Sequence, residues 1–331
     1  MKKQITMTLI LTALIFTFPA NAAQKYKVIA EASIPALNAS AQKLSTFADS
    51  VSKGTSIYIA GGVIALVFQI HDVSILKNLR ILFYADASGE NPLPKLAFIA
   101  EPARKDKVPS RIKFNKHKFP VKMINGRLFI AEDKELLNAV NELPPLKQSD
   151  EDITVTFLPS LYFNQCKGKI TLFKAKFEQE LSKGRKHTTE KVTKSLEAAE
   201  KLLKQCDTIS MTLKITSENL KLTTLITPLN NSKIAEIIKS KKGELSPEEF
   251  AEFSKKVSGT AGIPVTEQMT AALSLLLSKV LPGKTDTDKV AEQICKFHIF
   301  SNGEHLSVSI SVTPEQSKKI LEAAGIKLKN Q

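Results

Sequence analysis

The sequence predicts an α+β fold in which antiparallel sheets are packed on one face by helices. Three stretches support this, at residues 119–143, 209–241 and 296–325. In each, two segments alternate apolar and polar residues as half-buried strands do, a short turn separates them, and a helix-like segment follows. Because the same order occurs three times, we expect duplicated hairpin–helix units. A long helical hairpin is expected in the second half, over residues 159–206.

The last of these units turns at Asn302-Gly303. This dipeptide favours a two-residue type I′ hairpin turn, since both central residues of that turn need positive φ. Such a turn pairs Ile299 with Leu306 and places the apolar side chains on one face. The other face carries Lys296, His298, His305, Ser307, Ser309 and Ser311, with Phe300 as its one apolar residue.

A helix start follows each hairpin. Thr313-Pro314-Glu315 combines an N-cap residue, a proline at the first helical position and an acid in the first turn. Thr227-Pro228 comes at the same place after the middle hairpin and leads into an apolar helix side with Ile234, Ile237 and Ile238. In the first unit the turn is Asn125-Gly126 and the helix is expected from about Asp133.

The other elements come between these units. Helices are expected over 38–51, 161–181, 189–204, 247–257, 265–280 and 287–293, and strands over 80–85, 95–101 and 152–157. Residues 56–70 are apolar nearly all round, which leaves a buried helix or a buried strand open, with a helix favoured because Gly61-Gly62 would permit close packing. Leu143-Pro144-Pro145 and the polar run after it indicate a boundary between domains at 23–146 and 147–331.

Residues 1–22 have the pattern of a signal peptide. Two lysines precede an uncharged apolar run, and Ala20-Asn21-Ala22 supplies small residues before a cleavage site between Ala22 and Ala23. The apolar run is shorter than the roughly 20 residues that cross a bilayer as a helix, and no later segment is a second candidate. We therefore expect a periplasmic or secreted chain without a transmembrane span.

The chain of 331 residues is basic, with a formal net charge of +14. Such an excess favours an anionic envelope component as partner, either polysaccharide or lipid head groups. Aromatic residues make up 6% of the chain and Trp is absent, which argues against nucleic acid because single-strand binders rely on stacking. Lys183, Arg185 and Lys186 form a basic cluster at the turn expected between the helices over 161–181 and 189–204. These three residues are the predicted contacts for an anionic partner.

No motif in the sequence predicts a catalytic, cofactor-binding or metal-binding site. His298 and His305 share the polar face of the last hairpin but have no third ligand, so exposed histidines are favoured over a metal site. Ser40–Lys43 and Ser74–Lys77 match the S-x-x-K of penicillin-recognising enzymes, yet the companion motifs are missing and a lysine-rich chain produces such matches by chance.

The three cysteines predict one disulfide. Cys166 and Cys206 are centred on residue 186, so two antiparallel helices folded there would bring both to the same level. Both also fall on apolar helix stripes, which predicts a Cys166–Cys206 bridge; two buried thiols in contact are the alternative. Cys295 lies on the buried face of the last hairpin and is expected to remain a free thiol.

The stretch "CDTISMTLKITSENLKLTTLI" is expected to form a strand, a turn and a second strand, and two helices are expected before it. This arrangement resembles an uncharacterised family of exported bacterial envelope proteins built from repeated α+β units. The resemblance implies an extracytoplasmic α+β protein and supplies no catalytic residues. We therefore expect a non-enzymatic envelope binding or scaffolding protein. A periplasmic carrier of an apolar, lipid-like ligand and a hydrolase without a recognisable motif are the alternatives.

Overall fold

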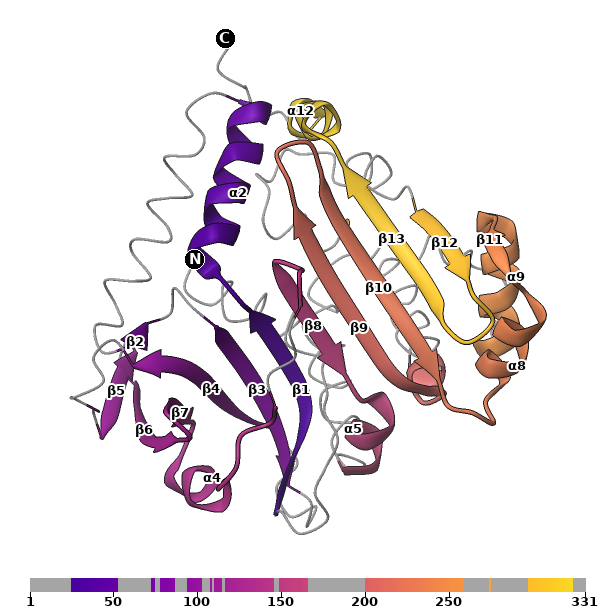
Figure 1. The fold of residues 1–331 in the computed structure, drawn as a ribbon. Helices are drawn as coiled ribbons and strands as arrows, with labels where there is room; N and C mark the ends of the chain where they lie inside the picture. The colour runs from indigo at the N-terminus through magenta and orange to yellow at the C-terminus, as the bar shows by residue number, and fades with distance from the viewer. Residues whose placement is uncertain are drawn as a thin grey trace, which may run out of the picture.

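A computed structural model gives the fold of the chain (Figure 1). It describes residues 25–52, 73–74, 78–86, 94–102, 108, 110–114, 117–145, 149–165, 200–258, 274 and 297–323. The first part of the described chain contains β1 (Tyr26–Ile34), α2 (Leu37–Val51), β2 (Val73–Ser74), β3 (Leu79–Asp86), β4 (Lys95–Pro102), β5 (Arg111–Phe114), β6 (His117–Ile124), β7 (Arg127–Ala131) and α4 (Lys134–Ala139).

The second part begins at the next strand. It contains β8 (Ile153–Phe157), α5 (Pro159–Gln165), β9 (Cys206–Ile215), β10 (Leu220–Pro228), α8 (Lys233–Ser240), β11 (Gly243–Leu245), α9 (Pro247–Ser258), β12 (Phe297–Ser301), β13 (Leu306–Val312) and α12 (Pro314–Ala323). The predicted helix over 38–51 and the predicted strands over 80–85, 95–101 and 152–157 correspond to α2, β3, β4 and β8.

All of these strands belong to one antiparallel sheet of 13 strands. Its order is β11-β12-β13-β10-β9-β8-β1-β3-β4-β7-β6-β5, and β2 attaches to β4. The two parts are joined at β8, where Val155 pairs with Ala32 of β1 on one side and with Met211 of β9 on the other. The predicted fold class, with separate sheets covered by helices, is therefore wrong: a continuous sheet dominates, and the described helices are short.

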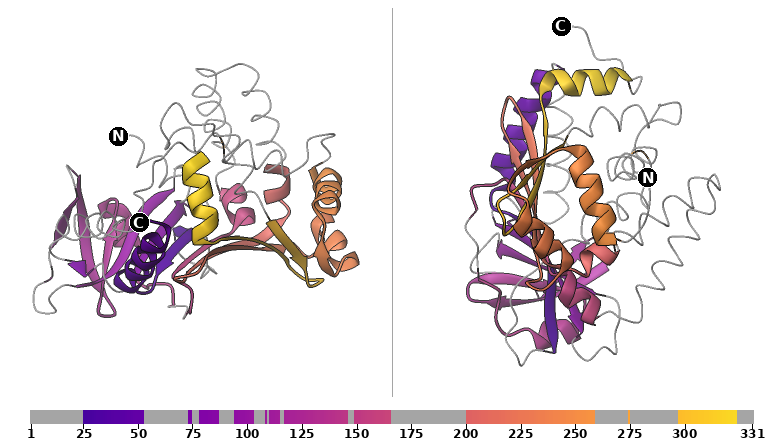
Figure 2. Two further views of the ribbon diagram at one scale, coloured as in Figure 1. Left: turned by 90° about the horizontal axis from the view of Figure 1, so that it is seen from above. Right: turned by 90° about the vertical axis from the view of Figure 1, so that its right-hand side faces the viewer.

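The prediction that helices cover a single face is also wrong. Leu82 and Thr156 share a face because both pair with Glu31 of β1, and α4 packs on Leu82 at this face. Phe157, the neighbour of Thr156, points the other way and packs in the cluster that contains Ile238 of α8. Thus α4 covers one face of the sheet, whereas α8 and α9 cover the opposite face farther along. Figure 2 shows α8 and α9, in orange, on one side of the curved sheet.

The two Asn-Gly turns differ. Asn125 and Gly126 have φ of 51° and 76°, and Ile124 pairs with Arg127, so the predicted two-residue turn is confirmed in the first unit. In the last unit Ser301 pairs with Leu306, which makes a four-residue loop and shifts the predicted register by two residues.

The side chain of Asn302 explains the longer loop. Its Oδ1 accepts hydrogen bonds from the backbone N of Glu304 (2.9 Å) and of His305 (2.7 Å), which closes a local turn inside the loop. Because a shift of two residues keeps every side chain on its face, the predicted apolar side is still buried, as Ile299 and Leu306 show.

Reciprocal capping fixes the start of α12. The backbone N of Gln316 donates to Thr313 Oγ1 (3.2 Å) and the backbone N of Thr313 donates to Gln316 Oε1 (2.8 Å). In the first unit, Asp133 caps α4 by accepting from Leu136 N (2.8 Å). The helix starts predicted at Thr313 and near Asp133 are therefore confirmed.

The long helical hairpin predicted over 159–206 is wrong. Within the described residues α5 covers Pro159–Gln165, and Cys206, predicted at the end of the second helix, is the first residue of strand β9, where it pairs with Pro228. Residues 166–199 lie outside the described part, as do the predictions over 56–70 and 287–293 and, apart from the helical Ser274, the prediction over 265–280.

Candidate functional site

The most distinctive polar surface lies on one face of β8, β9, β10, β13 and β12. Strand pairing places Thr154, Thr212, Thr223, Ser309 and His298 in one row across these strands. We call this surface the hydroxyl face; the rows beside it contain Thr156, Ser210, Leu225, Ser307 and Phe300, and Lys214, Lys221 and Ser311.

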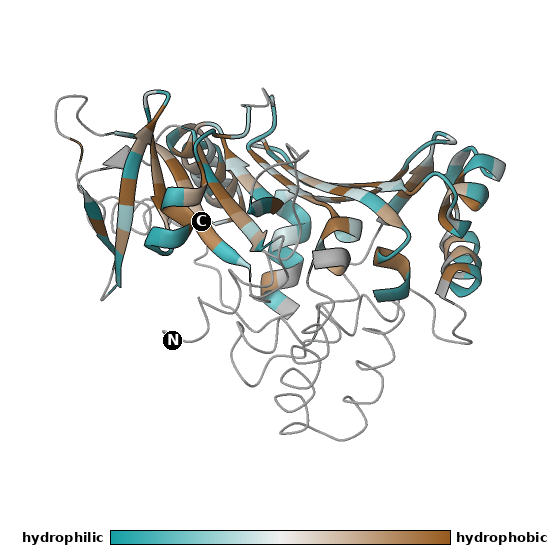
Figure 3. Cartoon of the chain, turned by 90° about the horizontal axis from the view of Figure 1, so that it is seen from below, coloured by the Kyte–Doolittle hydropathy of each residue, from teal (hydrophilic) through white to brown (hydrophobic). Residues whose placement is uncertain are grey.

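The hydroxyl face is the side away from α8 and α9. Those helices pack on Ile209, Ile299 and Leu306, whose side chains alternate with those of the hydroxyl face along the strands. Figure 3 shows this alternation of apolar and polar residues along the strands. Within the described part of the chain, no helix crosses β10 and β13 on this side, and α2 stands beside the end of β9 (Figure 1).

The hydroxyl groups at the centre of this face are available to a ligand. Ser210, Thr212, Thr223, Ser307 and Ser309 are half-buried, and among the described residues none of their side chains makes a hydrogen bond. By contrast, Ser311 at the edge donates to Asn219 Oδ1 at 2.7 Å. A hydroxyl both donates and accepts, so this group of five can match a partner rich in hydroxyl or acidic oxygens.

Two lysines lie directly opposite each other on this face. Lys214 of β9 pairs with Lys221 of β10, both are exposed, and neither forms an ion pair with a described residue. Like charges directly opposite on neighbouring strands are destabilising. An anion bound between the two ammonium groups would relieve that repulsion, which makes the pair a candidate anion contact.

Two large apolar side chains are exposed on the same face. Leu225 is 38% exposed and Phe300 is 51% exposed, and Ser307 stands between them in the row. The sequence showed Phe300 as the exception on the polar side of its hairpin, and the structure confirms that side chain as solvent-facing.

The histidines of the last hairpin are separated in the structure. His298 pairs with Ser309, rather than with Ser307 as the two-residue turn predicted, and its Nδ1 lies 3.4 Å from Glu244 Oε1. His305 lies in the loop, where its Nδ1 is 3.1 Å from Thr227 Oγ1. Among the described residues, no group of three or more His, Cys, Asp or Glu could hold a metal ion.

A second polar cluster joins α2 to the sheet. Asp152 Oδ1 accepts from Ser40 Oγ (3.1 Å) and Lys43 Nζ (2.7 Å), and its Oδ2 accepts from Ile215 N (2.8 Å). Burial by itself raises the pKa of Asp152, but the hydrogen bonds from Lys43, Ile215 N and Ser40 outweigh it, so the pKa lies below its usual value. The Ser40–Lys43 motif, interpreted as chance, thus has a structural role as the anchor of α2.

A third cluster surrounds Lys95. Its Nζ bonds to Asp133 Oδ2 (2.8 Å) and Glu135 Oε2 (2.6 Å) and lies 4.9 Å from the centre of the Tyr26 ring. Hydrogen bonds from Lys25 and Lys95 lower the pKa of Glu135 to about 2. These groups satisfy one another, so the cluster ties α4 to the sheet and offers no free charge to a ligand.

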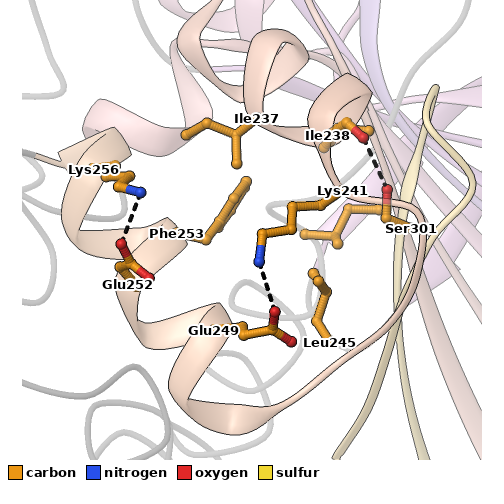
Figure 4. A pocket seen from close by; sticks show the side chains of 10 residues that line it. Ile237, Ile238, Lys241, Leu245, Glu249, Glu252, Phe253, Lys256 and Ser301 are labelled. Carbon is orange, nitrogen blue, oxygen red and sulfur yellow. Dashed lines mark hydrogen bonds and ion pairs between the residues drawn. The ribbon is translucent and has the colours of Figure 1, made fainter.

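A shallow pocket opens between α8 and α9 (Figure 4). Its charged groups are paired with each other: Lys241 Nζ with Glu249 Oε1 at 2.6 Å and Lys256 Nζ with Glu252 Oε1 at 2.8 Å. The remaining lining is largely the apolar contact of the two helices with β11 and the last hairpin: Ile237, Ile238, Leu245, Phe253 and Leu306. This pocket is part of the helix packing.

Most site residues predicted from sequence lie outside the described part of the chain. This applies to Lys183, Arg185 and Lys186, to Cys166 and Cys295, and to Ala22 and Ala23. Cys206 is described, and it is a free, buried thiol whose Sγ donates to Leu202 O at 3.2 Å. The hydroxyl face was not among the predicted sites, although the polar positions of the two hairpins were the signal for it.

Comparisons with known proteins add little to this geometry. No family model and no curated protein matches the sequence. Among solved structures, the one described as crystal form I of TP0453 matches with a TM-score of 0.31 and 10% identity, covering 92% of this chain and 95% of that chain. In the described residues, no helix is long and apolar enough to span a membrane.

Proposed function

We propose that this chain is an exported, non-enzymatic binding protein and that its hydroxyl face receives an anionic polymer. The observation that carries the proposal is the Lys214–Lys221 pair, two exposed cations that lie side by side on a sheet face and form no ion pair with a described residue. The formal net charge of +14 supports the same class of partner.

The remaining polar clusters support a binding role over catalysis. The Ser40 hydroxyl is buried and donates to Asp152, whose carboxylate is already occupied by Lys43 and by a backbone N–H. A nucleophile needs an accessible oxygen and a base that is free to take its proton. On the hydroxyl face, by contrast, the five central hydroxyl groups are half-buried and, like the two lysines, make no hydrogen bond or ion pair with a described residue.

The test measures binding of the full-length mature protein to two anionic polymers, polygalacturonate and polyglutamate. We expect affinity to fall when the salt concentration rises from about 20 mM to about 150 mM, because screening then shortens to about 8 Å. The double variant Lys214→Glu/Lys221→Glu should bind at least about tenfold more weakly.

A matched control comes from the same sheet. Lys113 of β5 and Lys118 of β6 also pair across strands and are both exposed. Lys113→Glu/Lys118→Glu changes the net charge equally, so it should leave affinity within about twofold if the hydroxyl face is the site. An equal loss in both variants, or no binding to either polymer, would overturn the proposal. A triple reversal of Lys183, Arg185 and Lys186 tests the contact predicted from sequence in the same assay.

A further inference from the structure

We infer that the polymer received by the hydroxyl face is an acidic glycan, with a sugar ring packed on Phe300. This inference rests on the proposed function and adds the chemical class of the ligand. It is carried by the row of side chains Ser210, Leu225, Ser307 and Phe300, in which apolar and hydroxyl groups alternate across four neighbouring strands.

A sugar ring presents C–H groups on its faces and hydroxyl groups around its rim. The exposed ring of Phe300 offers an apolar surface for the C–H groups, and Ser307 on the neighbouring strand offers a hydroxyl to the rim. Leu225, on the next strand, supplies a second apolar contact about 10 Å from Phe300, which is two strand spacings.

The distance to the lysine pair indicates an oligomer. Lys221 stands four residues from Leu225 along β10, and Phe300 is two strands away from β10. The rise per residue and the strand spacing together place Lys221 about 17 Å from Phe300. A single sugar is too short to contact both, so the ligand must be a chain of sugars whose acidic groups reach Lys214 and Lys221.

Three other anionic partners fit this surface less well. A membrane surface requires a continuous apolar face to insert, and here hydroxyl groups separate the two exposed apolar side chains. A nucleic acid requires successive aromatic platforms, whereas Phe300 is the one exposed aromatic side chain among the described residues of this face. An extended acidic peptide would bind best at a strand edge, and the central strands of this face have both edges paired.

The experiment uses the mature full-length protein with polygalacturonate, which has sugars and carboxylates, and with polyglutamate, which has carboxylates alone. We expect tighter binding to polygalacturonate at equal charge. Phe300→Ala should weaken binding of polygalacturonate about five- to tenfold and change binding of polyglutamate less than about twofold, because only the sugar uses the ring. Met123→Ala is the control: it removes another exposed apolar side chain (37% exposed), on β6 and away from the hydroxyl face, and should change neither affinity.

The outcomes separate the two proposals. If polyglutamate binds as tightly as polygalacturonate and Phe300→Ala affects neither, the glycan inference is overturned while anionic-polymer binding stands. If neither polymer binds, both fail. Preferential binding to anionic phospholipid vesicles over polygalacturonate would also overturn the inference, since the acidic groups would then belong to lipid head groups.

Discussion

Glu31 of β1 and Arg80 of β3 form an ion pair inside the sheet. Arg80 Nε donates to Glu31 Oε1, and the side chains of Arg80 and Glu31 are 1% and 6% exposed. Arg80 Nη1 also donates to the carbonyl oxygen of Pro144 at 2.6 Å. Because Pro144 lies in the segment that leads to β8, the guanidinium attaches the connection between the two parts of the chain to the sheet.

Glu31→Ala should lower the free energy of unfolding by about 3–5 kcal/mol, because it leaves the Arg80 charge buried without its carboxylate. The measurement is urea denaturation at pH 7. A double variant, Glu31→Leu/Arg80→Met, removes both charges and should lose less than the single variant. A single variant that loses under about 1 kcal/mol would show that water or another group compensates Arg80.

Asp152→Asn should destabilise the fold by about 2 kcal/mol at pH 7, since the carboxylate accepts two hydrogen bonds from Ser40 and Lys43 and one from Ile215 N. The pKa of Asp152 is lowered in the folded state, so the folded protein binds the carboxyl proton more weakly than the unfolded chain does. Its contribution is therefore present above about pH 4, near the unfolded pKa, and is lost as pH falls through the folded pKa.

The pH series supplies the decisive comparison for this variant. The difference in unfolding free energy between the natural chain and Asp152→Asn should shrink steadily as pH falls below about 4. Asp150→Asn, at an exposed position two residues earlier, is the control and should keep the unfolding free energy at pH 7 within about 0.5 kcal/mol of that of the natural chain. A difference that stays constant down to pH 2 would mean that the carboxylate charge does not hold α2.

Local signals in the sequence predicted local structure well. The alternation in 209–226 and 297–312 gave the buried and exposed sides of the strands, and Thr313 and Asp133 gave the helix starts, because these features depend on neighbouring residues alone. The Asn125-Gly126 turn follows for the same reason. At Asn302-Gly303 the same dipeptide gave a different loop, since the Asn302 side chain bonds to the backbone of residues 304 and 305.

Long-range organisation could not be predicted in this way. The joining of the sheet at β8 depends on pairs such as Ala32 with Val155, which are distant in sequence and have no local signature. The hydroxyl face was hidden for the same reason, since Thr154, Thr212 and Thr223 become one row only after three strands pair. The structural role of Ser40 and Lys43 could not be predicted either, because their partner, Asp152, is also distant in sequence.

Lys221→Glu should stabilise the protein and weaken polymer binding at once. The substitution replaces a repulsive pair with an attractive one opposite Lys214, which we expect to raise the free energy of unfolding by about 0.2–1 kcal/mol at low salt. The melting temperature and the polygalacturonate affinity of the same sample give both results. A gain in stability without loss of affinity would place the polymer elsewhere, and a loss of stability would show that the two ammonium groups do not repel each other in the fold.

Cys206 should resist alkylation in the native protein and react after unfolding. It is fully buried at the start of β9, where its Sγ donates to Leu202 O, and burial raises the pKa of the thiol to about 12. At pH 8 only about one thiol in ten thousand is then a thiolate, the form that reacts with iodoacetamide.

The same reagent tests the bridge that spacing predicted between Cys206 and Cys166. The structure has Cys206 as a free thiol, so we expect peptide mapping of denatured, unreduced protein to find it alkylated. Denatured protein reduced with dithiothreitol serves as the control for complete labelling. Recovery of an unreduced Cys166–Cys206 peptide would contradict the free thiol and restore the bridge. Rapid labelling of Cys206 in the native state would instead show that the start of β9 opens to solvent, because a thiol buried against Leu202 O cannot react without local unfolding.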